Sequence, residues 1–261
     1  MSRLSEIFAR KHKCFLPFVT AGYPDLETTL QILFELSESG ADIIELGVPF
    51  SDPIADGPTI QRSSFTALRH QYSLDDILKV VSEFRSRSET GIILMTYLNP
   101  VYQYGLAKLE EKSLEIGLDG ILISDLTPEE YIRLNAFRNL DTIFLAAPTS
   151  SDERLQAISK VSSGFLYLVA RTGVTGHPTD VAKSVPATLE RIRKYTDLPV
   201  AVGFGITSKE DVKLVWQWAQ GAVVGSAIVE FIEANIETCD LPARVGSMVQ
   251  NLIPSQPILT K

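Results

Sequence analysis

The chain has 261 residues, 45% hydrophobic and 21% charged, and it is long enough to bury roughly 70 to 75% of its unfolded surface in one large domain or two small ones. Its 24 basic and 32 acidic residues give a formal charge of −8, which argues against nucleic acid or an anionic membrane as a partner. Its two cysteines, Cys14 and Cys239, and three histidines fit neither a disulfide framework nor a protein-made metal site.

The beginning of the chain lacks the apolar segment of a signal peptide, and no apolar run reaches the ~18 residues of a membrane span. Because cysteines that form no framework suit a reducing compartment, we expect a cytoplasmic protein.

Short apolar runs recur along the chain and alternate with segments of helical periodicity. Eight of these runs have the character of strands that are buried on both faces. In chain order they are 15–20, 42–46, 92–97, 119–124, 142–146, 165–170, 199–203 and 222–225. Strands that alternate with helices in this way predict a parallel sheet.

Helix start signals support the segments between the runs. Asp25 can cap a helix that ends before Gly40. Thr127 and Glu130 form a capping box with Pro128 at the first helical position. The same box is predicted at two further places, which are Ser150 with Glu153 and Thr207 with Glu210.

Eight such units in about 250 residues predict a closed (β/α)8 TIM barrel, as a single domain over residues 1–261 with an N-terminal helix. The 50 residues from Asp42 to Ile92 predict an extended loop and helix insertion after strand 2. The alternative is a doubly wound open sheet, which normally has fewer strands and a glycine-rich turn after the first strand; here that turn reads TAGYPD. A barrel would carry its chemistry in the loops at the carboxyl ends of its strands.

Residues 45–58 read ELGVPFSDPIADGP and follow the second predicted strand. Glu45, between Ile44 and Leu46, either forms a salt bridge inside the barrel or points into its mouth to transfer protons with a raised pKa. Asp56 either organises a turn or caps the next helix, or it works beside Glu45. Three prolines stiffen this loop, which favours holding the two carboxylates together.

Glycine-rich turns follow the seventh and eighth predicted strands, at 202–207 and 223–228. These loops of a barrel commonly hold a phosphate, because glycines let backbone N–H groups approach the anion and a helix N-terminus assists. The alternative is that the glycines only permit tight turns. The long loop after the sixth strand resembles a lid over the phosphate, with Thr175 and Gly176 as its predicted contacts.

Eight segments of the chain together resemble one known family. They read FVTAGYPD, ELGVPFSDPIADGP, MTYLNPVYQYG, DGILISDL, APTSSDERL, ARTGVTG, VGFGIT and VVGSAIV, and they have the order and spacing of the tryptophan synthase alpha chain. The resemblance covers essentially the whole sequence. It implies a (β/α)8 barrel that cleaves indole-3-glycerol phosphate to indole and glyceraldehyde 3-phosphate, in an α2β2 heterotetramer with a beta chain that consumes the indole.

The resemblance also implies roles for individual residues by motif match. Glu45 takes the general acid/base position, and Asp56 takes the position that faces the indole nitrogen. The indole-pocket positions are Phe18, Tyr167 and Phe204, and the phosphate positions are Gly176, Gly205, Gly225 and Ser226. Two carboxylates suit this reaction, because protonation of indole C3 must precede cleavage and leaves positive charge on the ring nitrogen. No metal or other cofactor is required.

The tip of the loop after strand 2 supplies the candidates for contact with the beta chain, Asp52 and Pro53. Three other positions depart from the family pattern, which are Leu98, Ala170 and Gln220. None of the three removes a proton-transfer group. Two further functions remain open on the sequence alone: another phosphate-binding barrel enzyme, or a repurposed barrel subunit that mainly activates a beta chain. The presence of both Glu45 and Asp56 counts against the second.

Overall fold

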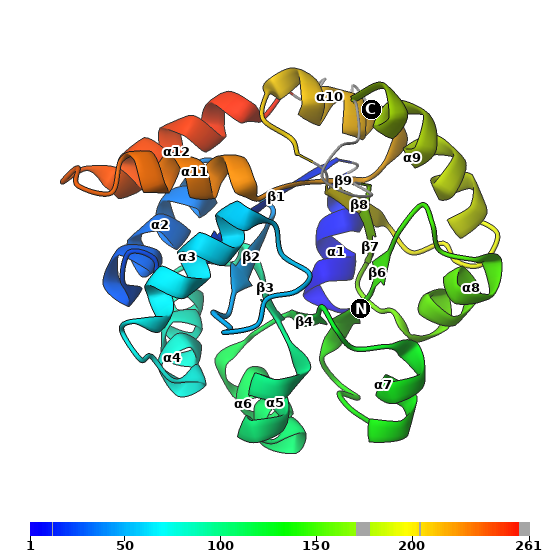
Figure 1. Cartoon of the computed structure of the whole chain (residues 1–261), viewed down its shortest axis with the longest axis horizontal. Coiled ribbons are helices and arrows are strands. Elements are labelled where there is room, and N and C mark those ends of the chain that lie inside the picture. The colour runs from blue at the N-terminus through cyan, green and yellow to red at the C-terminus, as the bar shows by residue number, and fades with distance from the viewer. Residues whose placement is uncertain (12, 171–177, 204, 256–261) are drawn as a thin grey trace.

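The computed structural model describes residues 1–11, 13–170, 178–203 and 205–255. Within these residues, nine parallel strands form one sheet surrounded by helices (Figure 1). The strands are β1 (Cys14–Thr20), β2 (Ile43–Gly47), β3 (Gly91–Thr96), β4 (Gly120–Ile123), β5 (Asp141–Ile143), β6 (Leu145–Ala146), β7 (Leu166–Val169), β8 (Val200–Gly203) and β9 (Gly221–Val224). The predicted (β/α)8 barrel is confirmed, and all eight predicted strands are present.

The ninth strand arises because the fifth predicted strand is divided at Phe144. Its first part, β5, pairs with β4, and its second part, β6, pairs with β7. The two edge strands of the sheet are therefore consecutive in the chain, and this one stretch of chain closes the barrel. The backbone N–H of Tyr167 donates to the Phe144 carbonyl at 3.1 Å across the junction.

The other helices surround the strands, and α1 lies inside the ring that these helices form (Figure 1). Their bounds are α1 (Arg3–Arg10), α2 (Leu26–Glu38), α3 (Pro58–Leu68), α4 (Leu74–Arg85), α5 (Leu98–Tyr104), α6 (Leu106–Ile116), α7 (Pro128–Leu134), α8 (Asp152–Val161), α9 (Pro178–Ile192), α10 (Lys209–Trp218), α11 (Ser226–Ala234) and α12 (Leu241–Leu252). The loop before α3, with α3 and α4, forms the predicted insertion after strand 2. Of the described helices, none is both long enough and apolar enough to cross a membrane.

Two of the predicted helix caps are correct and two are wrong by one residue. Asp25 caps α2, and the capping box predicted at the start of α7 is present. The cap of α8 is Ser151 rather than Ser150, and the cap of α10 is Ser208 rather than Thr207. In both cases two hydroxyl residues stand side by side before the helix, so the spacing alone does not decide which of them caps it.

Apolar side chains pack on both sides of the strand ring. The larger cluster lies between the strands and the outer helices. The smaller cluster lies at the amino-terminal ends of the strands and includes Leu4 and Phe8 from α1. The rings of Phe8 and Phe165 pack with their centroids 5.5 Å apart. Helix α1 therefore closes the amino-terminal end of the barrel, and the carboxyl end is the one that can hold a site.

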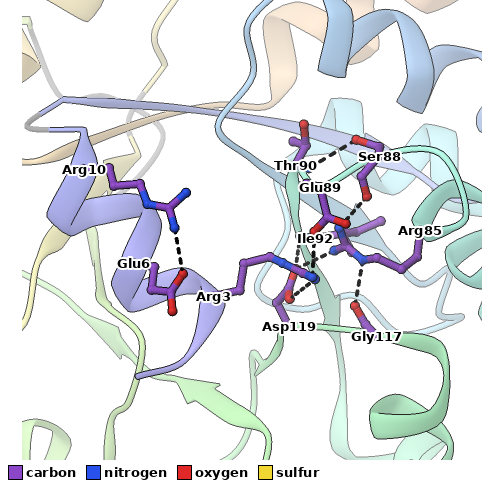
Figure 2. A network of polar contacts seen from close by, with 10 residues as sticks. All are labelled: Arg3, Glu6, Arg10, Arg85, Ser88, Glu89, Thr90, Ile92, Gly117 and Asp119. Carbon is purple, nitrogen blue, oxygen red and sulfur yellow. Dashed lines mark hydrogen bonds and ion pairs between the residues drawn. The ribbon is translucent and has the colours of Figure 1, made fainter.

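A polar network ties α1 to this closed end (Figure 2). The carboxylate of Asp119, directly before β4, accepts hydrogen bonds from Arg85 at 2.7 Å and from Arg3 at 2.9 Å. It also accepts the backbone N–H of Ile92 at 2.8 Å, and Arg3 pairs with Glu89 at 2.8 Å. A buried carboxylate at this end of the barrel is thus compensated by two guanidinium groups and one amide.

Candidate active site

Glu45 lies in β2 and points into the barrel. Ile43 belongs to the apolar cluster at the closed end, and side chains two residues apart in a strand share a face. Glu45 is 1% exposed, and neither a hydrogen-bond partner for its Oε1 nor a salt bridge is found among the described residues. Burial raises the pKa of its carboxyl to about 8, because a charge is costly away from water. The carboxyl is therefore mainly protonated at neutral pH.

Asp56 lies on the stiff loop between β2 and α3. Its backbone forms the turn, because its N–H donates to the Pro53 carbonyl at 3.0 Å and its carbonyl accepts from Gln61 Nε2 at 2.9 Å. Helix α3 follows Gly57 without a cap from any described side chain, so Asp56 does not cap it. Burial raises the pKa of the Asp56 carboxyl to about 6, and a hydrogen bond from the Tyr97 hydroxyl opposes that rise.

Tyr167, in β7, lies within electrostatic range of both carboxylates. Burial raises the pKa of its hydroxyl, and the negative charges of Glu45 and Asp56 raise it further. The hydroxyl lies directly against Gly203, where an added Cβ would collide with it. The structure thus brings three polar groups from separate elements together in the barrel.

A small cavity adjoins these groups and combines apolar walls with a few polar atoms. It is lined by Phe18, Gly47, Val48, Asp56, Ile60, Ser64, Met95, Thr96 and Tyr97. The ring of Phe18 lies against Gly47, where an added Cβ would come within 2.6 Å of the ring atom Cε2. The cavity is small, about 10 Å³, and its apolar side chains and single carboxylate match the chemistry of an aromatic ring that carries an N–H group.

A larger groove, of about 550 Å³, lies between α11 and α12. It is lined by side chains of these two helices and by Thr207, outside the group formed by Glu45, Asp56 and Tyr167. Its two charged residues, Asp240 and Arg244, pair with each other at 2.9 Å. The chemistry therefore points to the smaller cavity as the candidate active site, because Asp56, whose pKa is raised, lines it together with Phe18, the register neighbour of Glu45.

The N-terminus of α11 adjoins the same cavity. Its cap, Gly225, supplies no side chain, so the N–H groups of Ser226 and Ala227 have no side-chain cap from the described residues, whereas the Ile228 N–H donates to the Gly225 carbonyl at 2.9 Å. A Cβ at Gly225 would lie 3.5 Å from Phe18 Cβ and 3.8 Å from Ile60 Cδ1, and both of these residues line the cavity. The helix N-terminus can therefore hold an anion beside the aromatic pocket.

The N-terminus of α10 is different. Asp211 accepts hydrogen bonds from the backbone N–H groups of Thr207 at 3.0 Å and Ser208 at 2.9 Å, and Ser208 caps the N–H of Asp211 in return. The N–H groups of Thr207, Ser208 and Asp211 therefore already donate hydrogen bonds within the protein. Gly205, before them, is exposed and has a φ of +25° with open space around its Cβ position. Of the two glycine turns, the one at α11 has the N–H groups that no side chain of the described part of the chain caps.

Three predicted site residues, Thr175, Gly176 and Phe204, lie outside the described residues. Sequence reasoning missed others, since it assigned no role to Tyr97, Thr96 or Met95. The signal was available, because they end the third predicted strand on the side where a barrel carries its chemistry.

The predicted partner residues lie at the tip of the loop after β2. Asp52 is exposed and accepts a hydrogen bond from Ser51 Oγ at 2.6 Å. Pro53 is buried, whereas Ile54 is 84% exposed. The apolar side chain that this loop exposes is therefore Ile54 rather than Pro53.

The three departures from the family pattern lie in structural positions. Leu98 begins α5, and its N–H donates to Asp125 at 2.7 Å. Ala170 is buried after β7. Gln220 accepts hydrogen bonds from the N–H of Val200 at 3.1 Å and from Arg193 at 2.6 Å. It directly precedes β9, so it lies at the opposite end of that strand from Gly225.

Comparison with known proteins identifies the family of the chain. The family model described as tryptophan synthase alpha chain matches residues 4–251. The chain is 44% identical over 259 residues to the tryptophan synthase alpha chain of Geotalea uraniireducens, with 97% of each covered. It is similar to tryptophan synthase subunit alpha from Legionella pneumophila, with a TM-score of 0.88, 35% identity and 97% of each chain covered. It is also similar to a chain of the tryptophan synthase a2b2 complex from Pyrococcus furiosus, with a TM-score of 0.83, 39% identity, and 93% of this chain and 98% of that one covered.

Proposed function

The chain belongs to the tryptophan synthase alpha chain family, carbon–carbon lyases that cleave indole-3-glycerol phosphate to indole and glyceraldehyde 3-phosphate in tryptophan biosynthesis, and we propose that Glu45 and Asp56 carry out this cleavage. The observation that carries the proposal is the Glu45 carboxyl, which is buried in the barrel with no partner for Oε1 among the described residues. Such a carboxyl can give a proton and take one back at neutral pH.

Glu45 acts first as an acid in this proposal. With a pKa of about 8, it is mainly protonated at pH 7 and can donate its proton to indole C3. The resulting Glu45 carboxylate then takes the proton of the glycerol hydroxyl nearest the ring. The electrons of that O–H bond form the aldehyde, the carbon–carbon bond breaks, and its electron pair restores the indole ring. Glu45 ends the cycle protonated, as it began.

Asp56 stabilises the intermediate that this proton transfer creates. Protonation of C3 places positive charge on the ring nitrogen, and an ionised carboxylate that accepts the N–H hydrogen bond lowers the energy of that state. With a pKa of about 6, Asp56 is mainly ionised at pH 7. The two carboxyls thus differ in charge at the same pH, because Glu45 is the more deeply buried and Asp56 accepts the Tyr97 hydrogen bond.

The rest of the substrate follows from the geometry of the open end. We assign the indole ring to the cavity that Phe18 lines, with Tyr167 beside the carboxylates. The phosphate lies at the N-terminus of α11, on Gly225 and Ser226, with Gly205 on the neighbouring turn. Phe204 at the indole, and Thr175 and Gly176 at the phosphate, remain predictions from the sequence.

The beta chain is the proposed partner, in an α2β2 heterotetramer like the Pyrococcus furiosus complex. Asp52 and Ile54 project from the loop that carries Asp56, so a partner on this surface can favour the loop conformation that is active. We expect Ile54→Ser to weaken activation by a beta chain about tenfold. Leu114→Ser, at an exposed site on α6, is the matched control. Equal activation of both variants would remove Ile54 from the interface.

A cytoplasmic location is also proposed. Both cysteines are free, with Cys14 buried and Cys239 exposed, as suits a reducing compartment.

The direct test is to add indole-3-glycerol phosphate to the purified chain, alone and with a tryptophan synthase beta chain, and to measure both products. We expect indole and glyceraldehyde 3-phosphate in equal amounts, at a higher rate with the beta chain present. A chain that releases no indole in either case, but still activates the beta chain, would instead be the repurposed subunit that the sequence left open.

A further inference from the structure

Tyr97 lines the cavity of the proposed active site together with Asp56. It directly follows β3, where the strand opens into the cavity, and it is 3% exposed. We propose that Tyr97 is a positioning residue, whose hydroxyl holds the Asp56 carboxylate in the orientation that receives the indole nitrogen. This inference rests on the proposed role of Asp56.

Tyr97 contacts the loop after β2 at both of its ends. Near the start of the loop, the rings of Phe50 and Tyr97 stack with their centroids 4.9 Å apart and their planes at 27°. Near the end of the loop, the N–H of Ala55 donates to the Tyr97 hydroxyl at 3.0 Å, and the neighbouring Asp56, whose pKa this hydroxyl lowers, lines the same cavity as Tyr97. The buried side chain of Tyr97 therefore contacts both ends of the loop, and its hydroxyl lies beside Asp56.

The contacts of the Tyr97 hydroxyl determine which group can receive its proton. A phenol has one proton to donate and lone pairs to accept. Because the Ala55 N–H occupies a lone pair, the hydroxyl proton stays available to the Asp56 carboxylate, the charged group that acts most strongly on this hydroxyl. Burial, and then the negative charge of Asp56, raise the pKa of the Tyr97 hydroxyl, so it remains a donor throughout the neutral range.

The other groups around Asp56 do not replace this contact. Gln61, from α3, donates to the backbone carbonyl of Asp56 and leaves its carboxylate alone. Tyr167, from β7, interacts with the Asp56 charge, and so far as the structure is described it donates no hydrogen bond to it. Asp125, after β4, is negative and acts on Tyr97, where it favours the protonated hydroxyl.

Loss of the hydroxyl should change catalysis in a specific way. Its hydrogen bond favours ionised Asp56, so Tyr97→Phe should raise the pKa of Asp56 above its value of about 6. The acid limb of kcat/KM should then move to higher pH by about one unit. At pH 7 we expect kcat to fall about tenfold, about twofold of it from the raised pKa and the rest from the lost orientation of the carboxylate. KM should change less than threefold, because the phosphate site is untouched.

The experiment measures indole release against pH for wild type, Tyr97→Phe and Tyr104→Phe. Tyr104, in α5, also donates to a carboxylate, Asp75, at 2.6 Å, but it lies outside the cavity. Phenylalanine at position 97 keeps the ring that stacks on Phe50, so the variant should fold, and its melting temperature confirms this. Only Tyr97→Phe should shift the acid limb. An unshifted limb, with the rate unchanged or lowered equally at every pH, would overturn the inference.

A double variant separates this inference from the proposed function. If Tyr97 acts through Asp56, then Asp56→Asn with Tyr97→Phe should be no slower than Asp56→Asn alone. Losses that multiply would show that Tyr97 acts independently and would contradict the inference. A wild-type chain that cleaves no indole-3-glycerol phosphate, by contrast, would contradict the proposed function itself.

Discussion

Asp119 and Glu45 are both buried carboxylates of the barrel, and their surroundings are opposite. Asp119 lies before β4 at the closed end, where Arg85, Arg3 and the Ile92 N–H all donate to it (Figure 2). Glu45 lies in β2 and has no such partner among the described residues. Burial raises the pKa of both carboxyls, but the arginines oppose the rise at Asp119, whereas the Glu45 pKa reaches about 8.

The difference separates stability from chemistry along the barrel axis. At the closed end Asp42 repeats the compensated pattern, because it pairs with Lys11 at 2.9 Å and accepts the Phe15 N–H at 2.8 Å. A carboxylate that is needed only to hold the fold is given partners. Glu45, the carboxyl that we propose to move a proton, is left without them among the described residues, at a cost in stability, because partners such as arginine would hold it ionised.

The largest expected contrast is in catalysis. Glu45→Gln should lower kcat/KM for indole release by ~10²- to 10⁴-fold, because an amide cannot transfer the proton. Asp119→Asn should keep the activity of each folded molecule within about threefold, since it acts at the other end of the barrel. The rates are compared after the folded fraction has been measured by circular dichroism. A similar loss of kcat/KM in both variants would contradict a catalytic role that is specific to Glu45.

Stability should show the reverse contrast. Asp119→Asn leaves Arg85 and Arg3 without their shared charge, so it should lower the free energy of unfolding by about 3 to 5 kcal/mol. Glu6→Gln is the control, because it breaks the exposed pair with Arg10 and should cost less than about 1 kcal/mol. Urea unfolding at pH 7 measures both. If the two variants lost the same stability, the network would not hold the closed end.

The pH dependence of stability sharpens the contrast further. Between pH 5 and 8, folded wild type holds a proton on Glu45 that the unfolded chain has lost, so its stability falls as the pH rises through this window. Glu45→Gln lacks this proton. Its free energy of unfolding should therefore gain on wild type by roughly 2 to 4 kcal/mol from pH 5 to pH 8. A difference that stays constant over this range would show that Glu45 ionises normally.

The smallest expected effects are on substrate KM and on stability, at the N-termini of α11 and α10. Gly225→Ala should raise KM about tenfold, because the new methyl group crowds the phosphate at the uncapped N-terminus of α11. The fold should survive, since a Cβ there makes only ordinary contacts, the nearest at 3.5 Å. Ser208→Ala removes the cap of α10 and should cost about 1 kcal/mol of stability with KM unchanged. A raised KM in the second variant would place the phosphate at α10.

Much of the fold and both proposed catalytic carboxylates could be predicted from the sequence. Buried parallel strands leave long apolar runs, and a glutamate at the end of such a run has few structural uses. Local patterns were less decisive where two residues of one type adjoin, as at the caps of α8 and α10. The division of the fifth strand at Phe144 leaves no local signal, because it follows from closing the ring between β4 and β7.

The contacts that complete the site depend on residues far apart in the chain. Tyr97 reaches Ala55 across 42 positions, and Arg3 reaches Asp119 across 116. Neither pairing leaves a spacing that can be read locally. The sequence therefore indicated which carboxylates are candidates for catalysis, and the structure adds which buried carboxylates have compensating partners.

The protonation state of Glu45 is the most direct test of this account. Infrared difference spectroscopy between wild type and Glu45→Gln, with Asp56→Asn as a second reference, detects the C=O band of a protonated carboxyl. At pH 7 wild type should show a protonated carboxyl that Glu45→Gln lacks, and the band should disappear with a midpoint near pH 8. A Glu45 that is already ionised at pH 7, with its midpoint near the ordinary glutamate value of 4.5, would contradict the claim that an uncompensated carboxyl drives the reaction.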